Sequence, residues 1–289
     1  MEAMLPYRPP FDAGLLLGFL AQRAVPGVEE VTDGCYRRTV RLLHSSGIVD
    51  LAVWPADSAV SLRAHGLDAR DWEQVERRCC RVFDLDADPA AIQVVLGRDP
   101  LLAPLVKARP GLRIPRAFDP FEMAVRAVLG QQVSVAGART LAGRLVAALG
   151  KPLAEPRGSL THLFPTAERI AGADLSGLGL TRSRAATLQR LAAAVAGDDL
   201  LLDPAADGEQ TRARLLALPG IGPWTASYVA MRALADPDAL PAADLGLRRA
   251  LERLGLAADV KSVMARAESW RPWRSYATMH LWMSLLDPR

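Results

Sequence analysis

The stretch Leu218-Pro219-Gly220-Ile221-Gly222-Pro223-Trp224-Thr225 decides how we interpret the rest of the chain. Two glycines flank one apolar residue, between a helical pattern that ends at Leu218 and another that begins at Pro223. Glycine permits a positive φ or the close approach of another backbone, and proline at the first position of a helix costs no hydrogen bond. The amides of Gly220, Gly222 and Thr225 are therefore free to bind a phosphate oxygen, which predicts binding to a nucleic-acid backbone without base contacts. The alternative is an ordinary helical corner with no ligand.

Asp244 is the one carboxylate for which we predict a chemical role. It follows Pro241 and precedes an amphipathic run from Leu245 to Arg253, so it is also well placed to be a helix N-cap. Capping and catalysis are compatible, because a helix N-terminus favours an ionised carboxylate. A purely structural cap is the alternative.

Two further features accompany the hairpin. Gln131 and Gln132 interrupt an apolar pattern between two predicted helices, where they form either a solvated bend or a projection into the gap left by an extruded base. Aromatic residues are scarce in the chain, at 6%, yet several fall in its last third: Trp224, Tyr228, Trp270, Trp273, Tyr276 and Trp282. They either pack in a core or form a stacking pocket for a planar base. His280, between Met279 and Leu281, is typical of a core histidine.

Composition bounds the class of protein. The 289 residues suggest about two domains, and 50% hydrophobic with 23% charged residues indicates a folded globular chain. A net charge of +3 favours nucleic acid only weakly. The cations are almost all arginine, which either suits phosphate binding or reflects coding composition alone. Cys35, Cys79 and Cys80 lack the number and spacing of a disulfide framework, a zinc site or an iron–sulfur cluster. No apolar run approaches membrane length and no signal peptide is evident, so we expect a cytoplasmic protein.

The order of elements predicts an α+β fold. Short alternating runs between Cys35 and Arg63 indicate an antiparallel meander, which a helix at about Ala69 to Phe83 would cover. Residues 89–120 are rich in proline and glycine and indicate a boundary. Asp119 and Ser134 have the positions of N-caps for the next two helices. Everything after Lys151 is predicted to be helical.

These residues resemble the helix-hairpin-helix DNA glycosylase superfamily, most closely its bacterial AlkA-type 3-methyladenine DNA glycosylase II members. The resemblance extends beyond the hairpin and Asp244 over nearly the whole chain, through the runs Pro9–Asp12, Leu17–Ala21, Val125–Gln131 and Trp273–Ala277. It implies a TATA-binding-protein-like antiparallel-sheet domain over residues 1–91 and two mostly helical domains. The first helical domain would span residues 120–236 and carry the helix-hairpin-helix, and the second would combine residues 92–119 and 237–289.

The resemblance also implies roles for individual residues. Asp244 matches the catalytic aspartate, and Phe19, Trp224, Tyr228 and Trp282 match aromatic positions of the base pocket. Gln132 falls where a leucine wedge fills the space of the flipped nucleotide, a departure that leaves the role open to an amide. No cofactor or catalytic metal is implied, although a structural monovalent cation at the hairpin is compatible with the family.

The function implied is a monofunctional glycosylase that flips and excises alkylated purines, of the 3-methyladenine and 7-methylguanine type, from duplex DNA in base excision repair. The expected protein is a nucleoid-associated monomer without membrane contact. Glycosylases that also cut the strand carry a lysine where this chain has Trp224, which argues against an oxidised-base glycosylase with lyase activity. A non-catalytic helix-hairpin-helix module remains as the alternative from another class, against which Asp244 and the aromatic cluster speak.

Overall fold

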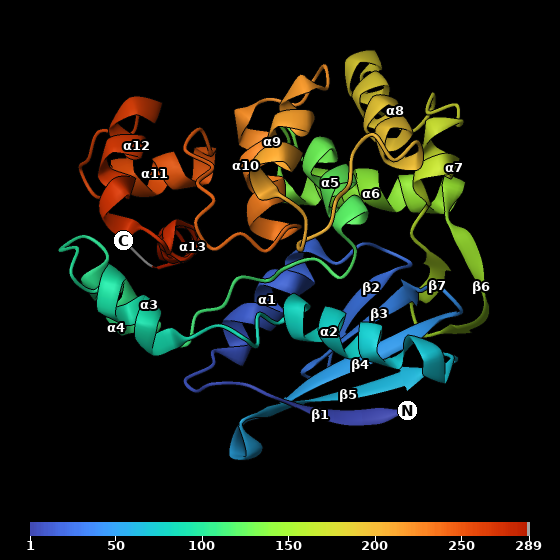
Figure 1. Cartoon of the computed structure of the whole chain (residues 1–289), viewed down its shortest axis with the longest axis horizontal. Helices are drawn as coiled ribbons and strands as arrows, with labels where there is room; N and C mark the ends of the chain where they lie inside the picture. The colour runs from blue at the N-terminus through green and yellow to red at the C-terminus, as the bar shows by residue number, and fades with distance from the viewer. Residues whose placement is uncertain (288–289) are drawn as a thin grey trace.

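A five-stranded antiparallel sheet occupies the N-terminal part of the computed structural model, which describes residues 1–287 (Figure 1). Its order is β1-β5-β4-β3-β2, from β1 (Glu2–Pro6), β2 (Glu29–Thr32), β3 (Cys35–Arg41), β4 (Ser46–Trp54) and β5 (Ala59–His65). The predicted meander corresponds to β3, β4 and β5, in which Tyr36, Leu51 and Leu62 are in register. The two edge strands β1 and β2 were not predicted, because they are short and pair with strands that are more regular in sequence.

Two helices cover the apolar face of this sheet (Figure 1). They are α1 (Ala13–Arg23) and α2 (Trp72–Val82), and a 3₁₀ turn, η1 (Pro55–Asp57), joins β4 to β5 while η2 (Ala69–Asp71) leads into α2. From α1, Leu16 and Leu20 enter the core that covers the sheet, whereas Phe19 enters a second apolar core that also contains Trp270. Helix α1 therefore ties the sheet to the part of the chain that carries the C-terminal helices.

The helical part that follows begins as the capping pattern predicts. Asp119 accepts a hydrogen bond from the Glu122 amide at 3.0 Å and starts α5 (Pro120–Leu129), and Ser134 accepts one from the Gly137 amide at 3.1 Å and starts α6 (Val135–Leu149). Further helices complete this part: α8 (Arg182–Ala196) and α10 (Pro223–Arg232) pack against α5, and α9 (Gly208–Ala217) packs against α10. Their shared core includes Val128, Leu188 and Leu215, all fully buried.

The prediction that everything after Lys151 is helical is wrong for residues 151–163. They form a hairpin of β6 (Lys151–Arg157) and β7 (Leu160–Leu163), followed by a one-turn helix, α7 (Ala167–Ala171). Tertiary contacts explain the strands, since the amides of Thr161 and His162 both donate to the Gly27 carbonyl, at 2.9 and 3.0 Å. β6 itself is mostly exposed and shows no alternation, so its sequence carried no strand signal.

The second helical part combines two separate segments. From the middle of the chain come α3 (Pro89–Leu96) and α4 (Ala103–Ala108), and from its end come α11 (Leu245–Arg253), α12 (Val260–Ala267), η3 (Glu268–Trp270) and α13 (Arg274–Ser284). Trp270 is fully buried among them. The three domain boundaries stay a prediction, and three separate clusters of buried apolar residues support it.

A cluster of buried charges joins the sheet to the first helical part. Arg38 on β3 contacts Glu122 of α5 at 2.6 Å and Glu29 of β2 at 3.6 Å. Arg126 of α5 contacts both carboxylates, at 2.8 and 3.0 Å, so two positive and two negative charges compensate one another. Burial alone would raise the pKa of Glu29, but the two arginines, together with hydrogen bonds from Tyr36 and the Val25 amide, lower that pKa overall.

Two expectations from composition concern the cysteines and the membrane. All three cysteines are free, and burial raises the pKa of the Cys80 thiol to about 11, so the thiol stays protonated at neutral pH. Within residues 1–287, no helix combines the length and the apolar character that crossing a bilayer demands.

His280 is a buried core residue, as its position between apolar neighbours predicts, with only 2% of its surface exposed. Burial, with a smaller contribution from Arg109, lowers its pKa to about 4, below the value of about 6.5 for a free histidine. The unfolded chain therefore binds a proton first as the pH falls, and stability is lost between about pH 6.5 and pH 4.

We predict that the free energy of unfolding falls by about 2 kcal/mol between pH 7 and pH 5 on account of this one group. In His280→Gln this component should disappear from urea-unfolding curves measured at both pH values. The exposed His44→Gln is the matched control and should keep the wild-type slope. An unchanged pH dependence in His280→Gln would contradict the assignment.

Candidate active site

Asp244 is the N-cap of α11, and its carboxylate is also held by two tryptophans. Oδ1 accepts hydrogen bonds from the Leu247 amide and from Trp282 Nε1, both at 2.8 Å. Oδ2 accepts one from Trp224 Nε1, also at 2.8 Å. A carboxylate offers about four lone-pair positions. Three are occupied here, so the open position is on Oδ2.

An aromatic wall flanks this carboxylate. Trp224 and Tyr228 lie one turn apart on α10, with ring centroids 5.3 Å apart and planes 24° apart, and Trp282 of α13 is 6.2 Å from Tyr228. All three side chains are half-buried, so part of each ring is accessible. Gly246 makes the approach of Trp282 feasible, because a Cβ there would lie 3.2 Å from the indole. The structure thus brings Asp244 together with three of the predicted pocket aromatics.

Phe19 lies beside this wall but beneath a layer of positive charge. It is only 4% exposed, and the Arg23 guanidinium lies 3.6 Å from its ring centroid, with Arg232 at 4.8 Å. Arg232 also donates to the Tyr228 hydroxyl at 2.9 Å, which fixes that ring. Phe19 therefore packs behind the two arginines of the pocket and exposes little of its own surface.

Arg23 is the residue of this site that sequence reasoning missed. Burial lowers its pKa to about 10, and it interacts electrostatically with Tyr228, Arg232 and Asp244. It remains charged at neutral pH and is a cation close to the carboxylate. The only signal in the sequence was its position one helical turn after Phe19, which puts both side chains on one face of α1.

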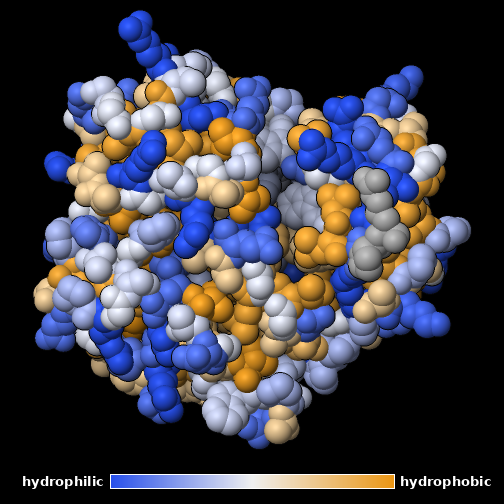
Figure 2. All heavy atoms as spheres, turned by 180° about the vertical axis from the view of Figure 1, so that it is seen from behind, coloured by the Kyte–Doolittle hydropathy of each residue, from blue (hydrophilic) through white to orange (hydrophobic). Residues whose placement is uncertain are grey.

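The two sides of the site come from different helical parts. Trp224 belongs to α10, whereas Asp244 and Trp282 belong to α11 and α13, which stand apart from α10 in the view of Figure 1. Seen from behind, the surface is hollowed between the two helical parts (Figure 2). A planar group that entered between them would meet aromatic faces, one open carboxylate position and a guanidinium.

The predicted backbone-binding hairpin uses its two glycines differently. Gly220 has φ +95°, and a Cβ there would lie 1.9 Å from Thr187 Oγ1. Gly222 has φ −95° and a Cβ would meet nothing within 4 Å. Gly220 is therefore required by the fold, whereas Gly222 leaves open space in front of the first turn of α10. The amide of Thr225 lies in that turn, where the N–H groups have no partner four residues earlier, and the Thr225 side chain is buried.

Gln132 stands at the tip of the loop between α5 and α6. It has a left-handed backbone with φ +54° and is exposed, as are its neighbours Val133 and Val135. An exposed, non-glycine residue with positive φ is uncommon and marks a constrained loop. Gln131 points inward instead and contacts the hairpin.

Three carbonyls of the hairpin each accept a hydrogen bond from the protein. The Leu218 carbonyl accepts from the Ile221 amide, the Pro219 carbonyl from Thr187 Oγ1, and the Gly220 carbonyl from Gln131 Nε2. A carbonyl oxygen has two lone pairs, so each keeps one position open, and the structural monovalent cation at the hairpin stays a prediction. Among residues 1–287 no cluster of histidine, cysteine and acidic side chains could hold a metal ion.

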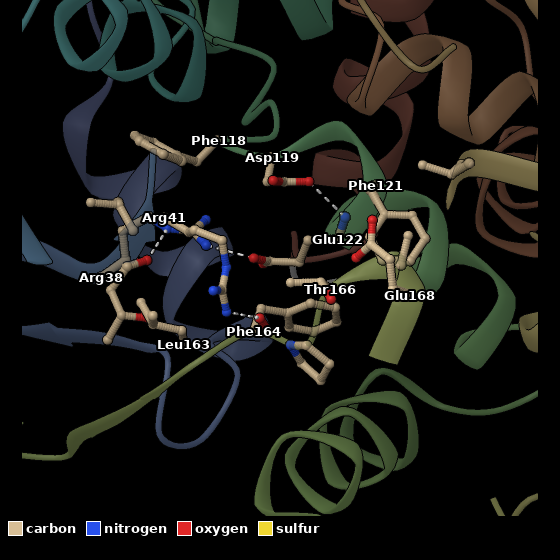
Figure 3. Close-up of a pocket in the computed structure, with 15 residues that line it drawn as sticks. Arg38, Arg41, Phe118, Asp119, Phe121, Glu122, Leu163, Phe164, Thr166 and Glu168 are labelled. Atoms are coloured by element: carbon tan, nitrogen blue, oxygen red, sulfur yellow. Dashed lines mark hydrogen bonds and ion pairs between the residues drawn. The ribbon is translucent and has the colours of Figure 1, made fainter. Parts of the chain in front are cut away.

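A cavity of about 270 Å³ lies elsewhere, between β3, α5 and α7 (Figure 3). Arg41 points into it and donates to the Phe164 carbonyl at 3.3 Å, while Arg38 and Glu122 of the buried charge cluster form part of its wall. None of the residues predicted for the base pocket, the hairpin or the wedge lines this cavity.

Comparison with known proteins agrees with this geometry. Residues 2–119 match the model of the AlkA N-terminal domain, and residues 125–275 match the model of the HhH-GPD superfamily of base excision DNA repair proteins. The second match includes the loop at Gln132, the hairpin and Asp244.

Individual relatives extend over almost all of the chain. It is 51% identical over 284 residues to a probable bifunctional transcriptional activator/DNA repair enzyme AlkA of Mycobacterium tuberculosis, covering 98% of this chain but only 57% of that protein. It is 36% identical to DNA-3-methyladenine glycosylase 2 of Escherichia coli, covering 96% and 95%. The solved 3-methyladenine DNA-glycosylase of Archaeoglobus fulgidus has a TM-score of 0.82 at 26% identity, covering 98% and 97%.

The contrast between the two glycines can be tested directly. Gly220→Ala forces both strain at positive φ and a clash with Thr187, so we predict a loss of about 1 to 3 kcal/mol in the free energy of unfolding. Gly222→Ala should leave stability within about 0.5 kcal/mol but weaken binding to an undamaged DNA duplex severalfold, because a methyl group would occupy the space of the phosphate. Unfolding curves and fluorescence-anisotropy titrations measure the two effects. Full duplex affinity in Gly222→Ala would refute the backbone-binding role.

Proposed function

This chain belongs to the HhH-GPD superfamily of base excision DNA repair proteins, and from that premise we propose that it is a monofunctional DNA glycosylase that excises alkylated purines. The observation that carries the proposal is the Asp244 carboxylate, held between Trp224 and Trp282 with one open position on Oδ2. A carboxylate and aromatic faces in one hollow are what removal of a planar, electron-poor base requires.

The substrate class follows from the chemistry of the pocket. An N3- or N7-alkylated purine carries a positive charge, so it stacks favourably on the electron-rich faces of Trp224, Tyr228 and Trp282. The same charge weakens its glycosidic bond, and the base needs little help from a general acid. The similar proteins of Escherichia coli and Archaeoglobus fulgidus are both named as 3-methyladenine glycosylases, which supports this substrate class.

In the reaction, the bond between C1′ of the deoxyribose and the purine nitrogen breaks and its electron pair moves to the base, which leaves neutral. Positive charge develops on the sugar, and Oδ2 of Asp244 stabilises it electrostatically. The oxygen of a water molecule then bonds to C1′, and its proton passes to Asp244 or to solvent. The products are a free purine and an abasic site.

Strand cleavage is not part of the proposed activity. A lyase needs an amine nucleophile, and the hairpin carries Trp224 where a lysine would be needed. The three lysines of the chain belong to other elements, with Lys107 on α4, Lys151 on β6 and Lys261 on α12. Trp224 instead donates a hydrogen bond to Asp244. A lysine at this position could also bond the carboxylate, but it would remove one ring of the aromatic wall.

The partner is duplex DNA, bound by a monomer through two contacts. The hairpin at Gly220 and Gly222 would bind the phosphate backbone without reading bases, and Gln132 would fill the space of the flipped nucleotide. Its exposure and its position at a loop tip support that role. Polar contacts from an amide to the remaining base are chemically feasible at this position.

A non-catalytic DNA-binding module is the second candidate. The hydrogen bond from the Leu247 amide is by itself sufficient reason for an aspartate at this helix N-terminus. In that case the wild type would release no base above the spontaneous rate, and removal of the carboxylate would affect stability alone. To separate the two candidates, Asp244 can be compared with another helix-capping aspartate that has no tryptophan partners. Asp259 is such a cap, on α12, and accepts from the Ser262 amide at 3.0 Å.

We predict that Asp244→Asn reduces the release of 3-methyladenine from methylated duplex DNA by about 100-fold or more, since the charge that stabilises the sugar cation is lost. Asp259→Asn changes a cap in the same helical part and should keep the wild-type rate. Single-turnover release at saturating protein separates chemistry from binding. Equal rates above the spontaneous rate in wild type and Asp244→Asn would contradict the catalytic role of Asp244, whereas no release above the spontaneous rate in either protein would favour the binding module.

Arg23 should tune the preference between charged and neutral bases. Its guanidinium repels a cationic purine, so Arg23→Gln should raise the ratio of 7-methylguanine release to hypoxanthine release severalfold. The exposed Arg63→Gln on the sheet is the control and should leave the ratio unchanged. The two single-turnover rates measure it, and a ratio that is unchanged in Arg23→Gln would show that this cation does not face the bound base.

A further inference from the structure

Gln131 connects two surface features that lie far apart in the sequence. Its Nε2 donates to the Gly220 carbonyl at 2.9 Å and to Thr225 Oγ1 at 3.0 Å. Both acceptors belong to the hairpin that would bind the DNA backbone. The next residue, Gln132, is the exposed loop tip. One amide group therefore bridges the hairpin and the α5–α6 loop, across 89 residues of sequence.

The main chain around Gln132 is fixed on both sides. The Gln131 amide donates to the Val128 carbonyl at 3.2 Å, and the Gln131 carbonyl accepts from the Arg184 guanidinium. On the far side, Ser134 caps α6. The left-handed conformation of Gln132 is thus determined by its neighbours, and the direction of its side chain depends on where Gln131 is held.

The hairpin is fixed on its inner side by the same set of contacts. Thr187 of α8 donates to the Pro219 carbonyl at 3.3 Å, and Gln131 takes the Gly220 carbonyl. Both carbonyls are therefore bonded to the protein, while the first-turn amides of α10 have no partner within their own helix. A displacement of the Gln131 side chain would therefore change the position of the hairpin relative to Gln132 without removing any group that contacts DNA.

We infer that Gln131 is a positioning residue that sets the register between the backbone-binding hairpin and the residue that enters the base stack. The inference rests on the proposed function and concerns how the two DNA contacts act together. When the hairpin binds a phosphate, the bridge holds Gln132 at a fixed offset from that phosphate, so the loop tip meets the stack at one nucleotide. Without the bridge, each contact would form independently.

The test replaces the donor while keeping the length of the side chain. Gln131→Met removes both hydrogen bonds, and Gln189→Met is the matched control, since Gln189 Nε2 donates to the Ala173 carbonyl at 2.9 Å in the same helical part. The first probe is a duplex with a tetrahydrofuran abasic site opposite 2-aminopurine, whose fluorescence rises when a side chain enters the stack. The second is the salt dependence of binding to an undamaged duplex, which counts phosphate contacts. Gln132→Ala gives the signal without a wedge.

We expect Gln131→Met to lose most of the 2-aminopurine response, close to Gln132→Ala, while its salt slope stays within about one phosphate contact of wild type. Single-turnover release of 7-methylguanine should fall about tenfold, as expected for the loss of two neutral hydrogen bonds. Gln189→Met should match wild type in all three measurements.

Two results would overturn the inference. One is a wild-type 2-aminopurine response in Gln131→Met. The other is a parallel loss of fluorescence response and salt slope together with a lower melting temperature than Gln189→Met, which would make Gln131 a support of the fold alone. The fluorescence and salt measurements need no base release, so they remain informative if wild type proves inactive on alkylated DNA, an outcome that would instead refute the proposed function.

Discussion

The cluster of Glu29, Arg38, Glu122 and Arg126 is the constraint on which the arrangement of the site depends. Removing any one member would leave an uncompensated buried charge, which typically costs about 3 to 5 kcal/mol. The cluster fixes α5 against the sheet, and Arg126 also donates to the Arg23 carbonyl at 2.7 Å. It therefore holds the end of α1, where Arg23 joins the pocket, and α5, whose C-terminal end leads into the loop of Gln131.

The site itself lies where two cores meet. Ala226 and Val229 of α10 belong to the core of the first helical part, whereas Ala230 and Met231 belong to that of the second. Because α10 packs into both, Trp224 keeps a defined position relative to Asp244 on α11. A pocket between two packed bodies can accommodate a flipped base while its walls remain supported from behind.

Sequence was sufficient where local chemistry decides structure and insufficient where tertiary contact does. The caps Asp119, Ser134 and Asp244 were predictable because in each the side chain accepts a hydrogen bond from the amide three residues later. The β6–β7 hairpin was not, since its strands depend on the Gly27 carbonyl, far along the chain. For the same reason the sequence indicated that Asp244 and Trp224 belong together but could not reveal Arg23, whose role arises from its electrostatic interaction with Tyr228 and Asp244, far along the chain.

The capping role of Asp244 gives its proposed catalytic role a direction. The Leu247 amide and the Trp282 indole both occupy Oδ1, so that oxygen is committed to the fold. Within residues 1–287, Oδ2 accepts a hydrogen bond from the Trp224 indole alone, which restrains the carboxylate from rotating and leaves one lone pair with a fixed orientation. An electrostatic stabiliser works best when it needs no reorganisation as charge develops. The helix cap, which by itself would support a purely structural role, therefore also preorganises the oxygen that we propose to be catalytic.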